Sequence, residues 1–109
     1  SSLGLNINKL ITFESLDITQ IPSSYYLRII AKDIPGVLAK ITSNLNEEDI
    51  SIETILQIPE KFISSDKIPI IIITHDTTNN LLMKALLKIE KLDFVLDKIT
   101  VLAIDKSFD

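Results

Sequence analysis

The sequence contains no cysteine and no tryptophan, and it has a single histidine, His75, and a single arginine, Arg28. Without cysteine the chain can form neither a disulfide scaffold nor a thiolate metal site, and thiol redox chemistry is excluded. Such a composition suits a reducing compartment, so we expect a cytoplasmic protein. The net charge is −4 and the basic residues form no cluster. Because clustered Lys and Arg supply the affinity for phosphate backbones, nucleic acid is not an expected partner.

Long apolar runs are also missing, since none approaches the roughly 20 residues that cross a bilayer. The first residues, SSLGLNINKL, contain neither the basic region nor the continuous apolar region of a signal peptide. We therefore expect a soluble protein without a membrane partner. Its 109 residues correspond to one domain with a core of its own. The sequence does not begin with Met, from which we expect it to be a piece of a longer chain.

Catalytic motifs are absent as well. The sequence has no G-x-G-x-x-G and no G-x-S-x-G, and His75 has neither a cysteine nor a second histidine to work with. We interpret His75 as a residue that caps or packs a loop, and the acidic run at 47–49 as a solvated helix end. The sequence thus predicts no catalytic residue, no metal site and no cofactor site in this chain.

What the chain does contain is a regular succession of strand and helix patterns. Four segments rich in β-branched residues are predicted to be strands: 25–31, 50–58, 67–75 and 98–104. Two segments with apolar residues three and four apart are predicted to be helices: 36–46 and 76–92. The strand at 67–75 is apolar on both faces, which predicts a central position. In the first helix, Lys40, Ser43 and Asn44 are expected to face water. Capping residues open the second helix at Asp76, Thr77 and Thr78.

The predicted order is β-α-β-β-α-β, an α+β, ferredoxin-like fold with a four-stranded antiparallel sheet and two helices on one face. This fold hosts many activities. A metallochaperone needs a Cys-x-x-Cys pair, which is absent. An RNA-binding sheet needs exposed aromatic and basic residues where this chain has Ile70 to Ile73, and an acylphosphatase needs an Arg in the first loop, where this chain has Asp33.

The junction AKDIPGVLAKI, residues 31–41, joins the first strand to the first helix. Pro35 presets its φ angle, and Gly36 allows a ligand or another backbone to come close. The free N–H groups of the new helix point out of this gap and attract anions such as the carboxylate of an amino acid.

The segment YYLRIIAKDIPGVLAKITSNLNEEDISIETILQ, residues 25–57, resembles the start of an ACT domain, and in particular the C-terminal regulatory domain of homoserine dehydrogenase. The likeness continues through IPIIIITHDT at 68–77 and ALLKIEKLDFVLDKIT at 85–100. The leading residues resemble the connection that follows the catalytic domain in that enzyme. The resemblance implies an extended connecting arm at 1–24 and an ACT domain at 25–109.

The resemblance further implies a parent enzyme that uses NAD(P) to interconvert homoserine and aspartate semialdehyde on the route to threonine and methionine. The nucleotide-binding and substrate-binding parts are missing, so the chain itself should be inactive. ACT domains commonly bind an amino-acid effector, here threonine, between the first loop and helix of one subunit and a neighbouring subunit's strand. The implied effector-binding residues are Asp33, Pro35, Gly36, Val37 and Leu38, joined by a polar face of the second strand, Ser51, Glu53 and Gln57.

Alternatives remain open at this point. Asp33 can instead cap the helix or close an Asx-turn, and Gly36 can serve the turn alone. The chain can accordingly be a structural dimerisation domain without a ligand site, or a free-standing ACT sensor. Apolar residues also alternate onto the sheet face away from the helices, and either the arm at 3–21 or a second subunit must cover them. We expect a homodimer with the arm packed on the face that carries Ile30, Ile55, Ile71, Ile73, Leu102 and Ile104.

Overall fold

The structure is a computed structural model and is described here for residues 20–59 and 66–104. The elements follow one another as β1 (Ser24–Lys32), α2 (Val37–Glu47), β2 (Ile52–Gln57), β3 (Lys67–Thr74), α3 (Asn79–Glu90) and β4 (Thr100–Ile104). This order confirms the predicted β-α-β-β-α-β succession. Most of the predicted arm, residues 1–19, lies outside the described residues.

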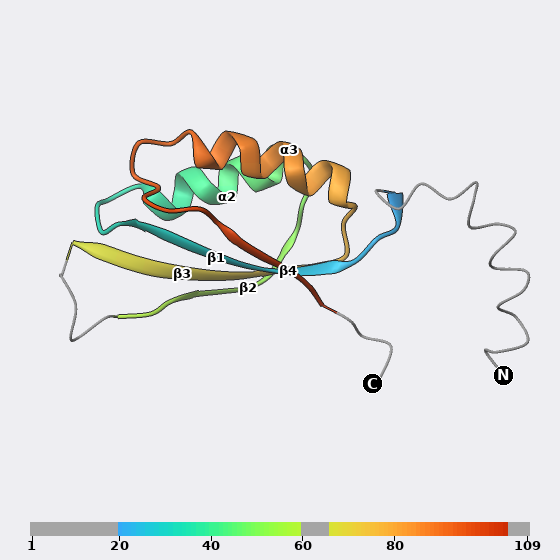
Figure 1. Ribbon diagram of the computed structural model, residues 1–109, viewed down its shortest axis with the longest axis horizontal. Coiled ribbons are helices and arrows are strands. Elements are labelled where there is room, and N and C mark those ends of the chain that lie inside the picture. Colours follow the sequence, from blue (N-terminus) through green and yellow to red (C-terminus); the bar gives the residue numbers. More distant parts are fainter. Residues whose placement is uncertain (1–19, 60–65, 105–109) are drawn as a thin grey trace, which may run out of the picture.

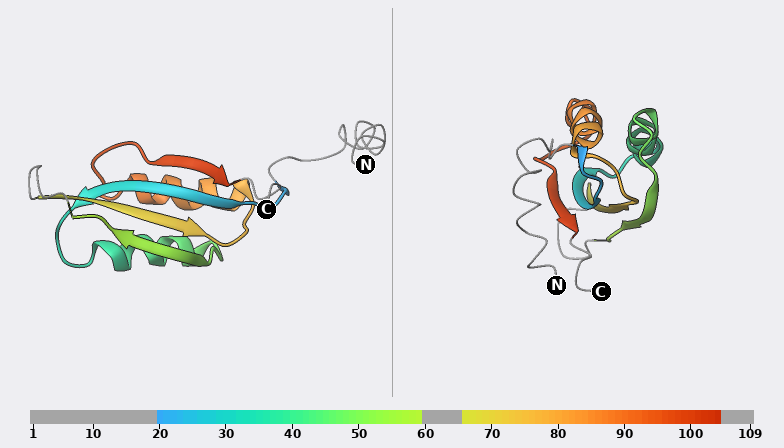
Figure 2. Two further views of the ribbon diagram at one scale, coloured as in Figure 1. Left: turned by 90° about the horizontal axis from the view of Figure 1, so that it is seen from below. Right: turned by 90° about the vertical axis from the view of Figure 1, so that its right-hand side faces the viewer.

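The four strands form one antiparallel sheet in the order β2-β3-β1-β4, and both helices cover the same face of it (Figures 1 and 2). The predicted ferredoxin-like fold is therefore confirmed. Strand β3 is central, as its apolar composition predicted, and β1 is its central neighbour. Within the described ranges no helix combines the length and the apolarity needed to cross a membrane.

The core lies between the sheet and the two helices. Alternate residues of the central strands point into it, and the register places Leu27 opposite Ile72 and Ile29 opposite Ile70. The helices supply residues three or four positions apart, because such residues share one face of a helix. These side chains are fully buried, and each contributes roughly 1.5–3 kcal/mol through burial: Leu27, Ile29, Ile41, Leu45, Ile70, Ile72, Leu82 and Ile89.

The prediction that Asn44 faces water is wrong. Asn44 is 8% exposed, and its Nδ2 donates a hydrogen bond of 2.9 Å to the Lys40 carbonyl one turn earlier. The reason is helical geometry, since Asn44 follows Ile41 by three residues and adjoins Leu45, both of which face the core. Lys40 and Ser43 are exposed as predicted.

Strand β2 contains an irregularity that the sequence pattern did not predict. Ile52 pairs with Thr74 and Thr54 with Ile73, so two steps along β2 match one step along β3, as in a β-bulge. The strict alternation predicted for 50–58 is interrupted at this point. Beyond the bulge, Ile55 pairs with Ile72 and therefore lies on the helix-covered side. The prediction that Ile55 lies on the opposite face is wrong for this reason.

The ends of the helices are held by specific contacts. Of the three predicted capping residues, Thr78 is the N-cap of α3, and its Oγ1 accepts a hydrogen bond from the Leu81 N–H at 3.3 Å. The acidic end of α2 is more than a solvated end. Nζ of Lys88 in α3 lies 2.9 Å from Oε1 of Glu47 and 2.9 Å from Oε2 of Glu48. These ion pairs link the two helices.

Candidate functional site

The turn between β1 and α2 is held by backbone hydrogen bonds. The Asp33 N–H donates to the Asp66 carbonyl at 2.9 Å, and the Ile34 N–H donates to the Lys32 carbonyl at 3.0 Å. Gly36 then adopts φ 87° and ψ −6°, a left-handed conformation that glycine reaches at little cost. The turn therefore requires Gly36 for its backbone conformation and not for space, since a Cβ atom there would meet no heavy atom within 4 Å.

The first turn of α2 is left without a side-chain cap. Gly36 occupies the N-cap position, and no side chain in the described part of the chain accepts a hydrogen bond there. The first bond of the helix runs from the Lys40 N–H to the Gly36 carbonyl at 3.0 Å, so the earlier N–H groups of the helix have no partner within it. The alternative in which Asp33 caps this helix is thus wrong, and the positive end of α2 is open to an anion.

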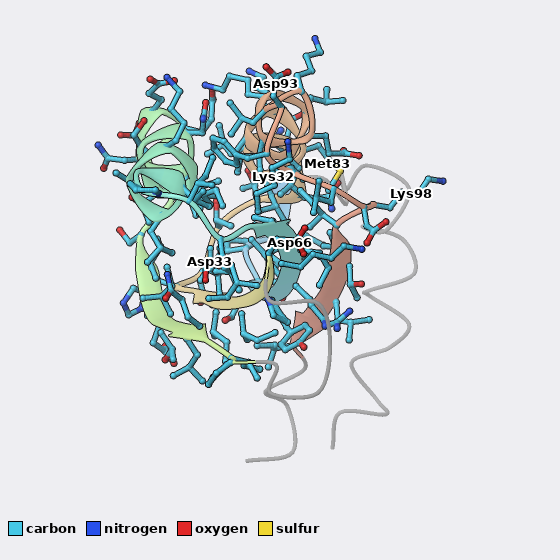
Figure 3. All side chains as sticks on the ribbon, turned by 90° about the vertical axis from the view of Figure 1, so that its left-hand side faces the viewer. Lys32, Asp33, Asp66, Met83, Asp93 and Lys98 are labelled. Atoms are coloured by element: carbon cyan, nitrogen blue, oxygen red, sulfur yellow. The ribbon has the colours of Figure 1, made fainter. Side chains whose placement is uncertain are left out.

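A cavity of about 260 Å³ lies at this turn. It is bounded by the junction on one side and by the ends of β2 and β3 on the other, and Figure 3 shows Asp33 below the start of α2, beside the sheet. The sequence-predicted residues that line it are Asp33, Pro35, Gly36, Val37, Leu38 and Gln57. The junction and the last residue of β2 are thus brought together in one place.

Two predicted site residues lie elsewhere in this single chain. Ser51 lines a separate groove of about 510 Å³ between α2 and the beginning of β2. Glu53 lies at the β-bulge, where its Oε2 is 3.6 Å from Nδ1 of His75, and both side chains are about half exposed. The His75 N–H donates to the Ser51 carbonyl at 2.9 Å, which holds this end of β2 against β3. Ser51 and Glu53 are therefore at the opposite end of β2 from Gln57.

Sequence reasoning missed other residues of the cavity, notably Lys32 and Ile68. Ile68 reaches the site because β3 pairs with β1 in a register that places Ile68 opposite Ala31. No spacing in the sequence signals this register. Lys32 directly precedes the turn and its position could have been inferred from that alone. Together Lys32 and Asp33 place one exposed charge of each sign at the cavity.

The described residues contain no group of His, Cys, Asp or Glu side chains arranged to hold a metal ion. The one clear pKa perturbation lies away from the cavity. Hydrogen bonds to Glu47, and next to Glu48, raise the pKa of Lys88 above its ordinary value of 10.5. Lys88 joins α2 to α3 and does not take part in the candidate site.

Comparison with known proteins gives a consistent result. The family model described as the ACT domain matches residues 25–91. A homoserine dehydrogenase from Neisseria gonorrhoeae is 38% identical over 94 residues, which are 86% of this chain and 21% of the relative. A homoserine dehydrogenase from Methylobacillus glycogenes is 36% identical over 104 residues, covering 95% of this chain and 25% of the relative.

Among solved structures, the crystal structure of a homoserine dehydrogenase from Thiobacillus denitrificans matches with a TM-score of 0.72 and 34% identity. The match covers 83% of this chain and 19% of that one. The chain therefore spans about a fifth to a quarter of the length of the proteins it matches.

Proposed function

Because the chain belongs to the ACT domain family, we propose that it is the regulatory, amino-acid-binding domain of a homoserine dehydrogenase and that threonine is its effector. The identities of 36–38% with homoserine dehydrogenases support this parentage. In this proposal the parent enzyme interconverts homoserine and aspartate semialdehyde with NAD(P), and the nucleotide and the substrate bind outside these 109 residues. The arm at 1–24 connects the ACT domain to the catalytic part.

The observation that carries the proposal is the uncapped start of α2 beside a cavity with a carboxylate at its edge. The effector's carboxylate binds the N–H groups that follow Gly36, where the helix dipole contributes about 0.3–1 kcal/mol and up to about 2 kcal/mol when partly buried. Asp33 accepts hydrogen bonds from the ammonium group. The effector's side chain contacts the apolar lining, which includes Leu38 and Ile68.

A second copy of the chain completes the site in this proposal. The cavity is open in one chain, and Ser51 and Glu53 lie away from it. Strand β2 pairs only with β3 among the described strands, so its outer edge is available to another strand. A homodimer joined at this edge brings polar residues of one β2 towards the neighbouring chain's cavity.

Calorimetric titration of the chain with threonine tests the proposal, with methionine, isoleucine and serine titrated in parallel. We expect threonine to bind with a Kd between millimolar and micromolar, which corresponds to about −4 to −8 kcal/mol. NADP(H) is expected to give no binding heat. If none of the amino acids binds while the chain is dimeric, the domain serves dimerisation alone. Binding of NADP(H) would contradict the proposal that the nucleotide binds outside these 109 residues.

A further inference from the structure

The sheet face away from the helices is largely apolar and is not covered by any described element (Figures 1 and 2). The strand register defines which residues share it, because Tyr26 pairs with Ile73 and with Leu102, and Leu56 pairs with Ile71. We call this surface the open face. Its central positions are Tyr26, Arg28, Ile30, Thr54, Leu56, Pro69, Ile71, Ile73, Thr100 and Leu102.

The open face is most exposed on its outer strands. Leu56 of β2 is 54% exposed and Leu102 of β4 is 57% exposed, whereas Ile71 between them is 8% exposed. Exposed apolar side chains on both outer strands of one sheet face mark a contact with another segment or molecule. A lone ferredoxin-like sheet would be expected to place polar residues at these positions.

The charge on the open face indicates what kind of segment covers it. Arg28 lies in the middle, with Ile71 opposite it on β3 and Thr100 opposite it on β4. None of the central positions named above is an Asp or a Glu, and Arg28 forms no ion pair within the described part of the chain. A segment that buries this face without supplying a carboxylate would leave the guanidinium group unpaired, at a high cost in free energy.

We propose that the open face is the docking surface of this chain's own residues 10–18, with the sequence LITFESLDI, and that one carboxylate of this segment, Glu14 or Asp17, pairs with Arg28. This segment has several apolar residues, two carboxylates and no cation. It thus offers apolar residues that can contact the open face and the negative charge that this face lacks. The proposal is independent of any effector.

The length of the chain allows this contact. Strand β1 starts at Ser24 and has nine residues, which span about 30 Å at roughly 3.3 Å per residue. Nine extended residues of the segment cover a similar distance. Glu14 precedes the described residue Gln20 by a stretch that reaches about 20 Å, and Arg28 lies about 13 Å along β1 from Ser24. A segment that turns back at the start of β1 therefore reaches Arg28.

Two other occupants are less compatible with the charges. A second copy stacked through the same face would bring another Arg28 and no carboxylate from the central positions of either sheet. Residues 60–65, EKFISS, carry Glu60 next to Lys61, so that their charges cancel. Both occupants nevertheless give distinct outcomes in the experiment below.

The absence of cysteine permits a direct test by NMR without effector. A nitroxide spin label on Ser15→Cys is expected to broaden the methyl signals of Leu56 and Leu102 and to leave those of Leu87, 60% exposed on α3, much sharper. A label on Leu87→Cys is the matched control and should broaden signals of the helices. Broadening that persists when spin-labelled chains without isotope are mixed with unlabelled, isotope-enriched chains would identify a second copy and overturn the proposal.

The charge pairing is tested by adding Glu14→Gln and Asp17→Asn to the spin-labelled chain. We expect the broadening of the Leu56 and Leu102 signals to fall severalfold, and we expect Lys9→Gln, a charge-removing control just before the segment, to leave it unchanged. If the labelled chain without these substitutions shows no broadening, the proposal is overturned. That result is expected if residues 60–65 cover the face. Broadening that survives neutralisation of both carboxylates overturns the assigned role of Glu14 and Asp17.

Discussion

Asp33 stands beside a helix that it does not cap. Its backbone N–H is bound to the Asp66 carbonyl, and the N-cap position of α2 belongs to Gly36. The described residues provide no side-chain hydrogen bond to Asp33 that would give its carboxylate a structural task at this helix. A carboxylate that contributes little to folding and lies at a cavity is a good candidate for ligand binding.

Replacing Asp33 with Ala is therefore expected to separate binding from folding. Threonine affinity should fall about tenfold or more, because a hydrogen bond to a charged group contributes roughly 1.5–3 kcal/mol, while the melting temperature should barely change. Calorimetry and thermal unfolding measure the two quantities, and Asp93→Ala, an exposed acid outside the cavity lining, is the control. A lower melting temperature with unchanged affinity would show that Asp33 is structural after all.

Gly36 allows a similarly clean test of backbone conformation. A Cβ atom added there would meet no heavy atom within 4 Å, so a substitution causes no clash and acts through the φ angle of 87°. Gly36→Ala should lower the free energy of unfolding by about 1–2 kcal/mol, and Gly36→Asn by less, since Asn tolerates the left-handed region. Urea unfolding measures both. Equal losses for Ala and Asn would contradict a conformational origin.

At the scale of elements, alternation predicted β1 well and predicted β2 only in part. In β1 every second residue meets the core, so that Leu27 and Ile29 were identifiable in advance, whereas β3 is apolar on both faces and its pattern predicted only a central position. In β2 the bulge between Ile52 and Thr54 moved Ile55 to the other face. A bulge depends on how two strands match in space, and the one-dimensional pattern carries no signal for it.

The link between the helices predicts how stability depends on pH. Hydrogen bonds to Glu47 and Glu48 raise the pKa of Lys88 in the folded chain above its ordinary 10.5. The folded state thus holds this proton more tightly than the unfolded state, so the stabilisation is complete below pH 10.5 and is lost as pH rises through the raised value. Urea unfolding at alkaline pH measures the free energy of unfolding. We expect this loss in the unsubstituted chain and not in Lys88→Met.

The control for this experiment is Lys91→Met, because Lys91 is exposed just beyond the end of α3 and forms no ion pair with the described residues. It should retain the alkaline loss of stability. Added salt should weaken the contribution of Lys88, since its side chain is 38% exposed and the pairs are accessible to ions. A pH profile unaffected by Lys88→Met would show that the ion pairs do not contribute.

At the scale of the whole molecule, the ferredoxin-like order was predictable because each element carries its own periodicity. The sequence indicated the cavity lining at the continuous stretch 33–38, and the family resemblance added Gln57. Gln57 and Ile68 complete the cavity through strand pairing, whereas Ser51 and Glu53 are carried to the far end of β2. Contacts between segments distant in the sequence decided both outcomes.

The outer edge of β2 makes the proposed homodimer testable with a single substitution. The Ile58 N–H donates to the Pro69 carbonyl at 3.0 Å, and in an antiparallel pair alternate residues turn their N–H groups to the same side, so the N–H of Ile55 points away from β3. We expect the chain to sediment as a dimer at micromolar concentration and Ile55→Pro to sediment as a monomer. Proline at this position removes an outward donor without breaking a bond of the β2–β3 ladder.

Ile55→Ala keeps the donor and removes the apolar side chain, which is 37% exposed, and it should remain dimeric. In the proposed dimer the site is completed across this edge, so threonine affinity should fall together with dimerisation in Ile55→Pro and survive in Ile55→Ala. A wild-type chain that sediments as a monomer would contradict the assembly. If Ile55→Pro remains a dimer, the interface lies at β4 or at the open face. In that case a strand of the second copy does not complete the cavity at Asp33.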